Sequence, residues 1–267
     1  MQTPELAALL PKVCRLAEAA GQAILLFYRQ GSLQVERKAD ASPLTEADLA
    51  AHRLILQGLQ DLTPAIPVLS EESGGIPYGE RHQWQQFWLV DPLDGTREFL
   101  EGSGQFTVNI ALVEAGIPIL GVVHAPALGL TYRTARGLGA YKGDEPIRAH
   151  PPAQPPLQVV ASRSHRDAET ERFLERLQRR YGSLEVKSVG SALKFCLVAE
   201  GSAHLYPRFG PTLEWDTAAA HCLVEQAGGS VTDLKGEPLR YNKPDLHNPP
   251  FMVAAAGAAY LWQDLLP

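Results

Sequence analysis

Residues 88–96 read Trp-Leu-Val-Asp-Pro-Leu-Asp-Gly-Thr, and this stretch decides the fold and the function that we expect. The apolar run 87–90 is short and continuous, so it predicts a fully buried strand that ends at Asp91. The proline that follows fixes one backbone dihedral, which makes the step from Asp91 to Asp94 stiff and leaves the Leu93 carbonyl free to point outward. Two carboxylates and a carbonyl can then converge on one point, which indicates a site for a hard cation such as Mg²⁺.

The residues after this turn extend the prediction to an anion. Gly95 lets the backbone approach a ligand closely, and Thr96 opens the short segment 97–100, whose N-terminal amides are able to face a phosphate. The alternative is an Asp-Pro turn followed by an Asp-Gly turn, and such pairs are common in any loop. On this stretch alone the two interpretations are even.

Two further acids occupy similar positions in the chain. Glu71 follows the apolar run 66–69, so it lies where another strand ends. Asp216 precedes the helical pattern 217–226, which ends at a Gly-Gly pair as helices commonly do. Each has a plainer explanation, since Glu71 also fits a solvated loop acid and Asp216 also fits an N-cap. The cation site is favoured because all three motifs place acids at the ends of apolar elements.

The composition is that of an ordinary globular protein. The chain has 267 residues, 45% hydrophobic and 20% charged, with a net charge of −6. This charge argues against nucleic-acid polymers and anionic membranes, because both need a basic face. The 3 cysteines have no CxxC spacing, which argues against disulfides or a zinc knuckle and fits a reducing cytoplasm. We expect a cytoplasmic chain with no signal peptide and no transmembrane segment. A homodimer and peripheral association with the inner face of the cell membrane stay open.

Hydrophobic periodicity predicts two lobes. Apolar residues at helical spacing over 6–27 predict a first helix, and the alternating stretch 106–141 predicts an antiparallel meander. Prolines crowd the stretch 151–156 and indicate a boundary, beyond which strands and helices alternate up to a final helix. We therefore expect an α+β lobe over residues 1–150 and an α/β lobe over residues 151–267.

Thr45 and Asp48 stand at the start of the second expected helix. Their three-residue spacing is that of a capping box, in which each side chain accepts a hydrogen bond from the other's backbone. A purely structural role in capping this helix is therefore enough to explain both residues.

Taken together, the motifs resemble the inositol monophosphatase superfamily of Mg²⁺-dependent, lithium-sensitive phosphatases. The stretches that carry this resemblance are 40–48, 70–72, 88–99 and 215–229. Within the superfamily, the CysQ-type 3′(2′),5′-bisphosphate nucleotidases are resembled by stretches 162–165, 190–201 and 205–212. The resemblance runs from about residue 12 to about residue 253, with only conservative departures at Leu44 and Arg97. It implies a layered αβαβα sandwich like that of fructose-1,6-bisphosphatase.

The resemblance also implies roles for the acids. The groups that would bind two to three Mg²⁺ ions are Glu71, Asp91, the Leu93 carbonyl, Asp94 and Asp216. Asp48 and Thr96 would share a hydrogen bond, and with Glu71 they would orient and help deprotonate the attacking water. Physics supports the grouping, because two carboxylates about 4 Å apart repel by roughly 4 kcal/mol at an effective dielectric of about 20. Acids gathered in one cleft need cations to stay ionised.

The substrate that the resemblance implies is a small nucleotide bisphosphate. It is 3′-phosphoadenosine 5′-phosphate, cleaved to AMP and phosphate by in-line attack of water, with the related 5′-phosphosulfate as a second substrate. The residues that would contact it are Gly95, Thr96, His165, Ser191, Lys194, Arg208 and Asp216. Taken singly, Lys194 also fits a solvated helix residue, Arg208 a loop charge and His165 a surface imidazole.

Two other functions compete with this prediction. An inositol monophosphatase shares every metal ligand, so only the donors for the second, non-reacting phosphate separate it from a nucleotidase. A non-catalytic nucleotide-binding regulator belongs to a different class, but it has no need for the complete set of acids together with Thr96.

Overall fold

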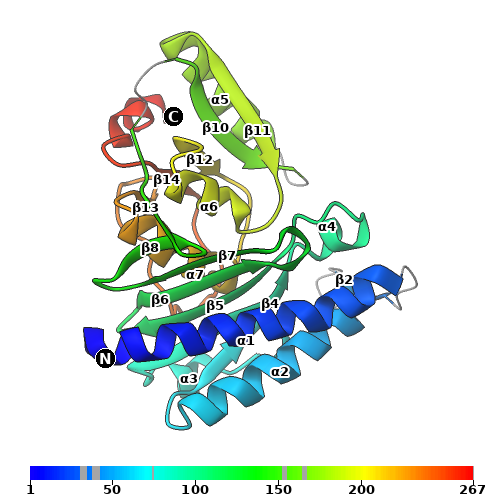
Figure 1. Cartoon of the computed structure of the whole chain (residues 1–267). Helices are drawn as coiled ribbons and strands as arrows, with labels where there is room; N and C mark the ends of the chain where they lie inside the picture. The colour runs from blue at the N-terminus through cyan, green and yellow to red at the C-terminus, as the bar shows by residue number, and fades with distance from the viewer. Residues whose placement is uncertain (31–34, 38–42, 74, 152–154, 164–166, 267) are drawn as a thin grey trace.

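The fold is a stack of layers in which helices alternate with two β-sheets (Figure 1). A computed structural model describes residues 1–30, 35–37, 43–73, 75–151, 155–163 and 167–266. Helices α1 and α2 cover one face of a seven-stranded sheet, and α7 covers its other face. Helix α6 packs on α7 and contacts a five-stranded sheet, whose edge strand β11 contacts α5. This arrangement confirms the expected αβαβα sandwich.

The first layer consists of α1 (Thr3–Gln30) and α2 (Glu46–Leu62). Apolar residues recur every three or four positions, so each helix has one buried stripe. The stripe of α2 is formed by Ala47, Ala51, Ile55 and Leu59, all 0% exposed. Both helices pack on the sheet through these stripes, which confirms the helices predicted here.

The larger sheet has the strand order β3-β4-β5-β6-β7-β8-β9. Strands β3 and β4 are parallel, and the remaining neighbours are antiparallel, which confirms the meander. The strands are β3 (Val68–Ser70), β4 (Gln86–Asp94), β5 (Thr107–Glu114), β6 (Ile117–Ala125), β7 (Leu130–Ala135), β8 (Gly139–Lys142) and β9 (Glu145–Ile147).

Strand β4 is buried on both faces, which explains its continuous apolar sequence. Trp88 and Val90 belong to the core under α1 and α2, whereas Phe87 and Leu89 belong to the core on the opposite face. The prediction that this strand ends at Asp91 was wrong. It continues to Asp94, with its register to β5 shifted between the two aspartates, because a bulge absorbs the proline.

The smaller sheet has the strand order β11-β10-β12-β14-β13. Strand β10 pairs in parallel with β11 and β12, and β14 is antiparallel to both of its neighbours. The elements of this half are β10 (Leu157–Ser162), α5 (Ala168–Tyr181), β11 (Leu184–Val189), α6 (Leu193–Ala199), β12 (Leu205–Arg208), α7 (Glu214–Gln226), β13 (Ser230–Asp233) and β14 (Phe251–Ala254). The expected final helix is instead two short 3₁₀ turns, Ala259–Leu261 and Gln263–Leu265.

Short elements complete the described part of the chain. The hairpin of β1 (Val35–Arg37) and β2 (Pro43–Thr45) precedes α2, while α3 (Tyr78–Arg81) and α4 (Thr96–Leu100) flank β4. Two 3₁₀ turns cover Glu71–Ser73 and Pro126–Leu128. Among the helices of the described residues, none combines the length and the apolar character that crossing a membrane requires.

Helix α7 is buried almost all round because it lies between the two sheets. It belongs to the second half of the sequence, yet it packs on β5 and β6 of the first half. The side chains of its central turns are mostly small, and Gly121 of β6 faces the Ala219 carbonyl so closely that a Cβ atom would overlap it. The division at residue 150 stays a prediction about folding units, since one core cluster includes residues from both sides of it.

Replacing Gly121 with alanine tests this seating of α7 on the sheet. The added methyl group would displace backbone of α7, so we expect Gly121→Ala to lower the free energy of unfolding by about 1 to 3 kcal/mol. Gly79→Ala is the matched control, because no atom lies within 4 Å of a Cβ built there. Urea unfolding of both variants measures the effect. Equal stability of the two variants would contradict the packing described.

Candidate active site

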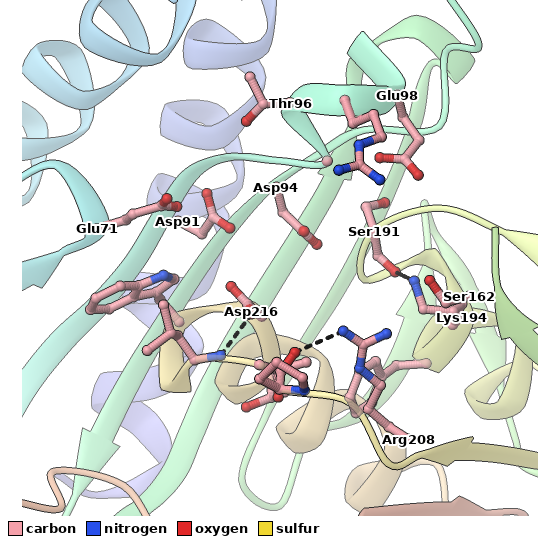
Figure 2. A pocket seen from close by; sticks show the side chains of 18 of the residues that line it. Glu71, Asp91, Asp94, Thr96, Glu98, Ser162, Ser191, Lys194, Arg208 and Asp216 are labelled. Atoms are coloured by element: carbon pink, nitrogen blue, oxygen red, sulfur yellow. Dashed lines mark hydrogen bonds between the residues drawn. The ribbon is translucent and has the colours of Figure 1, made fainter. Parts of the chain in front are cut away.

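A cleft of about 540 Å³ opens where β4, α4, α6, β12 and α7 meet. Among its lining residues are the expected Glu71, Asp91, Leu93, Asp94, Gly95, Thr96, Ser191, Lys194, Arg208 and Asp216. Figure 2 shows Glu71 and Asp91 on one side, Ser191, Lys194 and Arg208 on the other, and Asp94 and Asp216 between them. The cleft thus has an acidic side and a basic side. His165 was also expected here, but it lies outside the described residues.

Three carboxylates of the cleft lie close enough to share a cation. One oxygen each of Asp91, Asp94 and Asp216 lies within 4.8 Å of the others. The bulge in β4 turns the first two toward the same side, and the Leu93 amide donates a hydrogen bond to Asp91 Oδ1 at 3.0 Å. Glu71 follows β3, the parallel neighbour of β4, so its carboxylate reaches the same cleft.

Asp94 is held by donors from both halves of the chain. Its Oδ2 atom accepts a hydrogen bond from the Ala192 amide at 2.6 Å, just before α6. From β5, Asn109 Nδ2 donates at 3.2 Å and Thr107 Oγ1 at 3.4 Å. These contacts fix the orientation of the carboxylate and leave its second oxygen without a protein donor among the described residues.

Asp216 lies inside α7, not before it. The helix begins at Glu214, so the expectation that Asp216 precedes the helix was wrong, and Leu213 is the N-cap residue. The Asp216 carboxylate accepts the Leu213 amide at 2.8 Å, as an acid in a first helical turn often does. The sequence pattern placed the start of the helix at residue 217, too late in the chain, because the hydrophobicity of Glu214 and Trp215 does not mark them as helical.

The acids of this cleft raise one another's pKa. Burial raises the pKa of Asp91 well above its usual range, and the neighbouring carboxylates raise it further. Burial and the charges of Asp94 and Glu71 do the same to the pKa of Asp216. The pKa of Asp94 rises to about 6 through burial, although the Lys194 charge opposes this. A divalent cation would reverse the repulsion, and oxygen donors are those that Mg²⁺ prefers, so the donor set fits that ion.

Thr45 and Asp48 form the capping box that their spacing predicted. Asp48 Oδ2 accepts the Thr45 amide at 2.8 Å and the Thr45 hydroxyl at 2.5 Å, and both residues are buried. The Thr96 hydroxyl lies in the cleft and donates to the Leu93 carbonyl at 3.4 Å. Asp48 is not among the residues that line the cleft, and its hydrogen bond to Thr96 stays a prediction.

Some hydrogen-bond donors on the basic side of the cleft have no acceptor among the described residues. Lys194 is 6% exposed, so it is not the solvated helix residue of the plainer explanation, and burial lowers its pKa to about 8. Its ammonium donates to the Ser191 carbonyl at 2.6 Å, and Arg208 Nη2 donates to the Pro211 carbonyl at 2.8 Å. Arg208 Nε and the Ser191 hydroxyl are buried with no hydrogen-bond partner in the described part of the chain. Such groups suit an anionic ligand.

Ser191 has a backbone conformation that L-residues rarely adopt. Its φ is +48°, in the left-handed region. The preceding Gly190 leaves no room for a side chain, since a Cβ there would lie 2.6 Å from Glu98 Cγ. This tight approach of α4 to the start of α6 places the Ser191 hydroxyl in the cleft.

Several lining residues escaped the sequence reasoning. They are Glu98, Tyr206, Trp215, Thr217 and His247, together with Arg97, Ser162, Phe195, Phe251 and residues 211–213. Glu98 and Trp215 lie within the motif stretches 88–99 and 215–229, so the motifs gave a signal for them. His247 lies in a loop that reaches the cleft through long-range contacts, among them its pairing with Leu213, and no local pattern reveals such contacts.

Comparisons with known proteins agree with this geometry. The model of the inositol monophosphatase family matches residues 5–265. The 3′(2′),5′-bisphosphate nucleotidase CysQ of Escherichia coli strain K12 is 51% identical over 253 residues, covering 92% of this chain and 99% of that protein. The crystal structure of CysQ from Bacteroides thetaiotaomicron has a TM-score of 0.78 and 44% identity, covering 90% of this chain and 94% of the other. An IMPase from Thermotoga maritima has a TM-score of 0.79 but 26% identity, covering 95% and 96%.

The raised pKa of Asp94 predicts a pH-dependent effect on stability without metal. A carboxyl whose pKa is higher in the folded chain stabilises the fold below its unfolded pKa and loses that contribution as pH rises through the folded value, here about 6. In EDTA, the stability of Asp94→Asn relative to the wild type should therefore rise by on the order of 2 kcal/mol between pH 4.5 and pH 7.5. Denaturant unfolding at both pH values measures this. A difference that does not change with pH would contradict the assignment.

Proposed function

The chain belongs to the inositol monophosphatase family, and we propose that it is a Mg²⁺-dependent nucleotidase that hydrolyses 3′-phosphoadenosine 5′-phosphate to AMP and phosphate. The observation that carries this proposal is a single cleft with clustered acids on one side and buried basic groups on the other, where Arg208 Nε and the Ser191 hydroxyl have no partner among the described residues. The 51% identity to a curated 3′(2′),5′-bisphosphate nucleotidase supports it. The related 5′-phosphosulfate is the second substrate in this proposal.

The acidic side is the proposed site for Mg²⁺, on which the family generally depends. Its ligands in this proposal are Glu71, Asp91, the Leu93 carbonyl, Asp94 and Asp216, which together would hold two to three ions. Bound Mg²⁺ would lower the pKa of a water molecule and neutralise the oxygens of the phosphoryl group. Lithium sensitivity is typical of the family and is expected of this chain too.

Residues around the acids prepare the attacking water. Thr96 presents its hydroxyl in the cleft and orients the water, while Glu71 accepts a hydrogen bond from it. Asp48 takes up the proton through Thr96, and the two Thr45 donors keep the Asp48 carboxylate in place. Gly95 lets the phosphate approach the start of α4, since its φ of +90° is one that a larger residue avoids.

The basic side is the proposed site for the phosphate that does not react. Lys194, the Arg208 guanidinium and the Ser191 hydroxyl bind it, with His165 as a further expected contact. An inositol monophosphate has no second phosphate to place there, and this favours the nucleotidase over the inositol monophosphatase. The predicted cytoplasmic location, the homodimer and the membrane association belong to the proposal as well.

A phosphate-release assay tests the reaction. Purified chain should release phosphate from 3′-phosphoadenosine 5′-phosphate with millimolar Mg²⁺ and stop when EDTA is added. Asp94→Asn should keep the fold by circular dichroism yet lose at least about a hundredfold in kcat/KM, because a metal ligand loses its charge. Near-native activity of that variant at ordinary Mg²⁺ would contradict the metal site.

Truncating the basic donors tests substrate recognition separately. Lys194→Ala and Arg208→Ala should each lose about one to two decades in kcat/KM on the bisphosphate, since one charge-assisted contact contributes about 1.5 to 3 kcal/mol. Hydrolysis of 3′-AMP, which lacks the second phosphate, should stay about as slow as before. Lys187→Ala is the control, because this lysine donates to Gln158 outside the cleft. An equal loss on both substrates would mean that these residues serve the fold or the metal site.

A further inference from the structure

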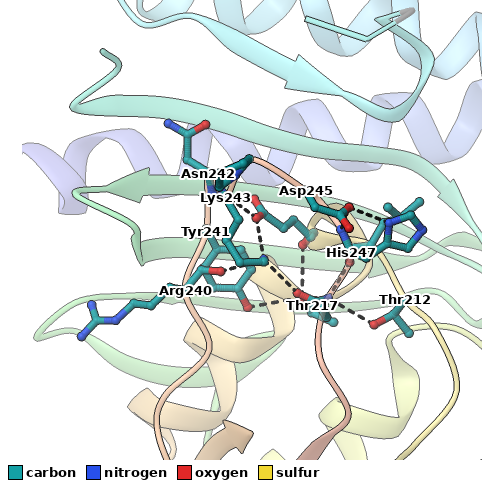
Figure 3. A network of polar contacts seen from close by, with 12 residues as sticks. Thr212, Thr217, Arg240, Tyr241, Asn242, Lys243, Asp245 and His247 are labelled. Carbon is teal, nitrogen blue, oxygen red and sulfur yellow. Dashed lines mark hydrogen bonds and ion pairs between the residues drawn. The ribbon is translucent and has the colours of Figure 1, made fainter. Parts of the chain in front are cut away.

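The loop 240–248 is tied to the cleft by a network of polar contacts (Figure 3). From the first half of the chain, Arg81 is 3% exposed and donates to the Lys243 carbonyl, to the Pro244 carbonyl at 2.9 Å and to Asn242 Oδ1 at 3.0 Å. A buried guanidinium with three acceptors in one loop fixes the path of that loop. Arg81 itself does not line the cleft.

Glu214 holds the same loop from the other side. It is 0% exposed, and its carboxylate accepts the Asn242 amide at 2.6 Å, the Lys243 amide at 2.9 Å and the Lys243 ammonium at 2.6 Å. A buried acid with three donors is strongly held, because removing any donor leaves part of its charge uncompensated. Glu214 is also the first residue of α7, two positions before Asp216.

Asn248 completes the connection to α7. Its side-chain amide donates to the Leu213 carbonyl at 2.8 Å and to the hydroxyls of Thr212 and Thr217, each at 3.1 Å. Two backbone hydrogen bonds run beside it, from the Asn248 amide to Thr212 and from the Glu214 amide to Leu246. Every residue of 212–217 apart from Glu214 lines the cleft. The loop therefore holds the cleft wall that carries Asp216.

We propose that Glu214 and Asn248 are positioning residues that set the affinity of the cleft for Mg²⁺. They hold the backbone at 212–214 so that the Leu213 amide donates to Asp216 Oδ2, and this hydrogen bond fixes the direction of the carboxylate. The inference rests on the proposed function, in which Asp216 is a metal ligand. Groups that orient ligands in this way commonly change metal affinity by 10- to 100-fold when they are removed.

Three variants of the full chain test the proposal. Glu214→Gln removes the charge that pairs with Lys243, and Asn248→Ala removes the direct link to the cleft wall. Glu200→Gln is the matched control, because Glu200 is also a mostly buried acid, paired with Lys142 at 2.8 Å, but it does not line the cleft. Calorimetric titration with Mg²⁺ alone measures the affinity for the ion. Hydrogen exchange of peptides covering 211–218 in EDTA measures how firmly the backbone of the cleft wall is held.

We expect Glu214→Gln and Asn248→Ala to bind Mg²⁺ about tenfold more weakly, with faster exchange at 211–218. Their kcat at saturating Mg²⁺ should return close to the wild-type value, because the catalytic groups are intact. Glu200→Gln should lose stability without either change. Wild-type Mg²⁺ affinity in both test variants would overturn the proposal, whatever their stability.

Two further outcomes are decided by the same design. If Glu214→Gln does not fold, Asn248→Ala alone decides, because it leaves the Glu214–Lys243 pair in place. If the wild-type chain binds no Mg²⁺ and releases no phosphate, the proposed function is overturned. The exchange measurement still tests whether Glu214 and Asn248 fix the backbone of the cleft wall, since it uses neither metal nor substrate. Unchanged exchange in both variants would overturn that positioning role as well.

Discussion

The mutual repulsion of Asp91, Asp94 and Asp216 is the constraint on which the rest of the site depends. Carboxylate oxygens within 4.8 Å of one another repel by about 3 kcal/mol per pair at an effective dielectric of about 20. The fold tolerates them because each is held by rigid backbone, and because the cleft admits a cation to offset the charge. Without the cation, the pKa values of all three acids are raised, so their carboxylates take up protons at a higher pH than usual.

The two sheets fix the positions of these acids relative to one another. The bulge at the end of β4 supplies two of them, and α7, seated between the sheets, supplies the third. Close approach at Gly121 and Gly190 lets the second half of the chain settle against the first. The Ala192 amide then reaches Asp94, so the basic side of the cleft is fixed relative to the acidic side. Metal binding and substrate recognition thereby depend on the same packing.

Much of this was predictable from local patterns, and the remainder depended on distant contacts. Residues 87–90 predict a buried strand because both of its faces are apolar, and the spacing of Thr45 and Asp48 predicts their capping box. The bulge that carries β4 on to Asp94 was missed, since its cause is pairing with β5. Arg81 and Glu214 gave no signal, because each acts through a loop more than twenty residues away in the sequence. Contacts of that kind have no period or motif.

Proton release on Mg²⁺ binding tests the central claim most directly. If the cleft acids are protonated without metal, Mg²⁺ must displace protons as it binds. Calorimetric titration of the wild-type chain at pH 6, in buffers with different ionisation heats, gives the number released. The account predicts a net release of protons from the wild-type chain, and a smaller release from Asp94→Asn. Binding of Mg²⁺ without proton release, or no binding at all, would contradict it.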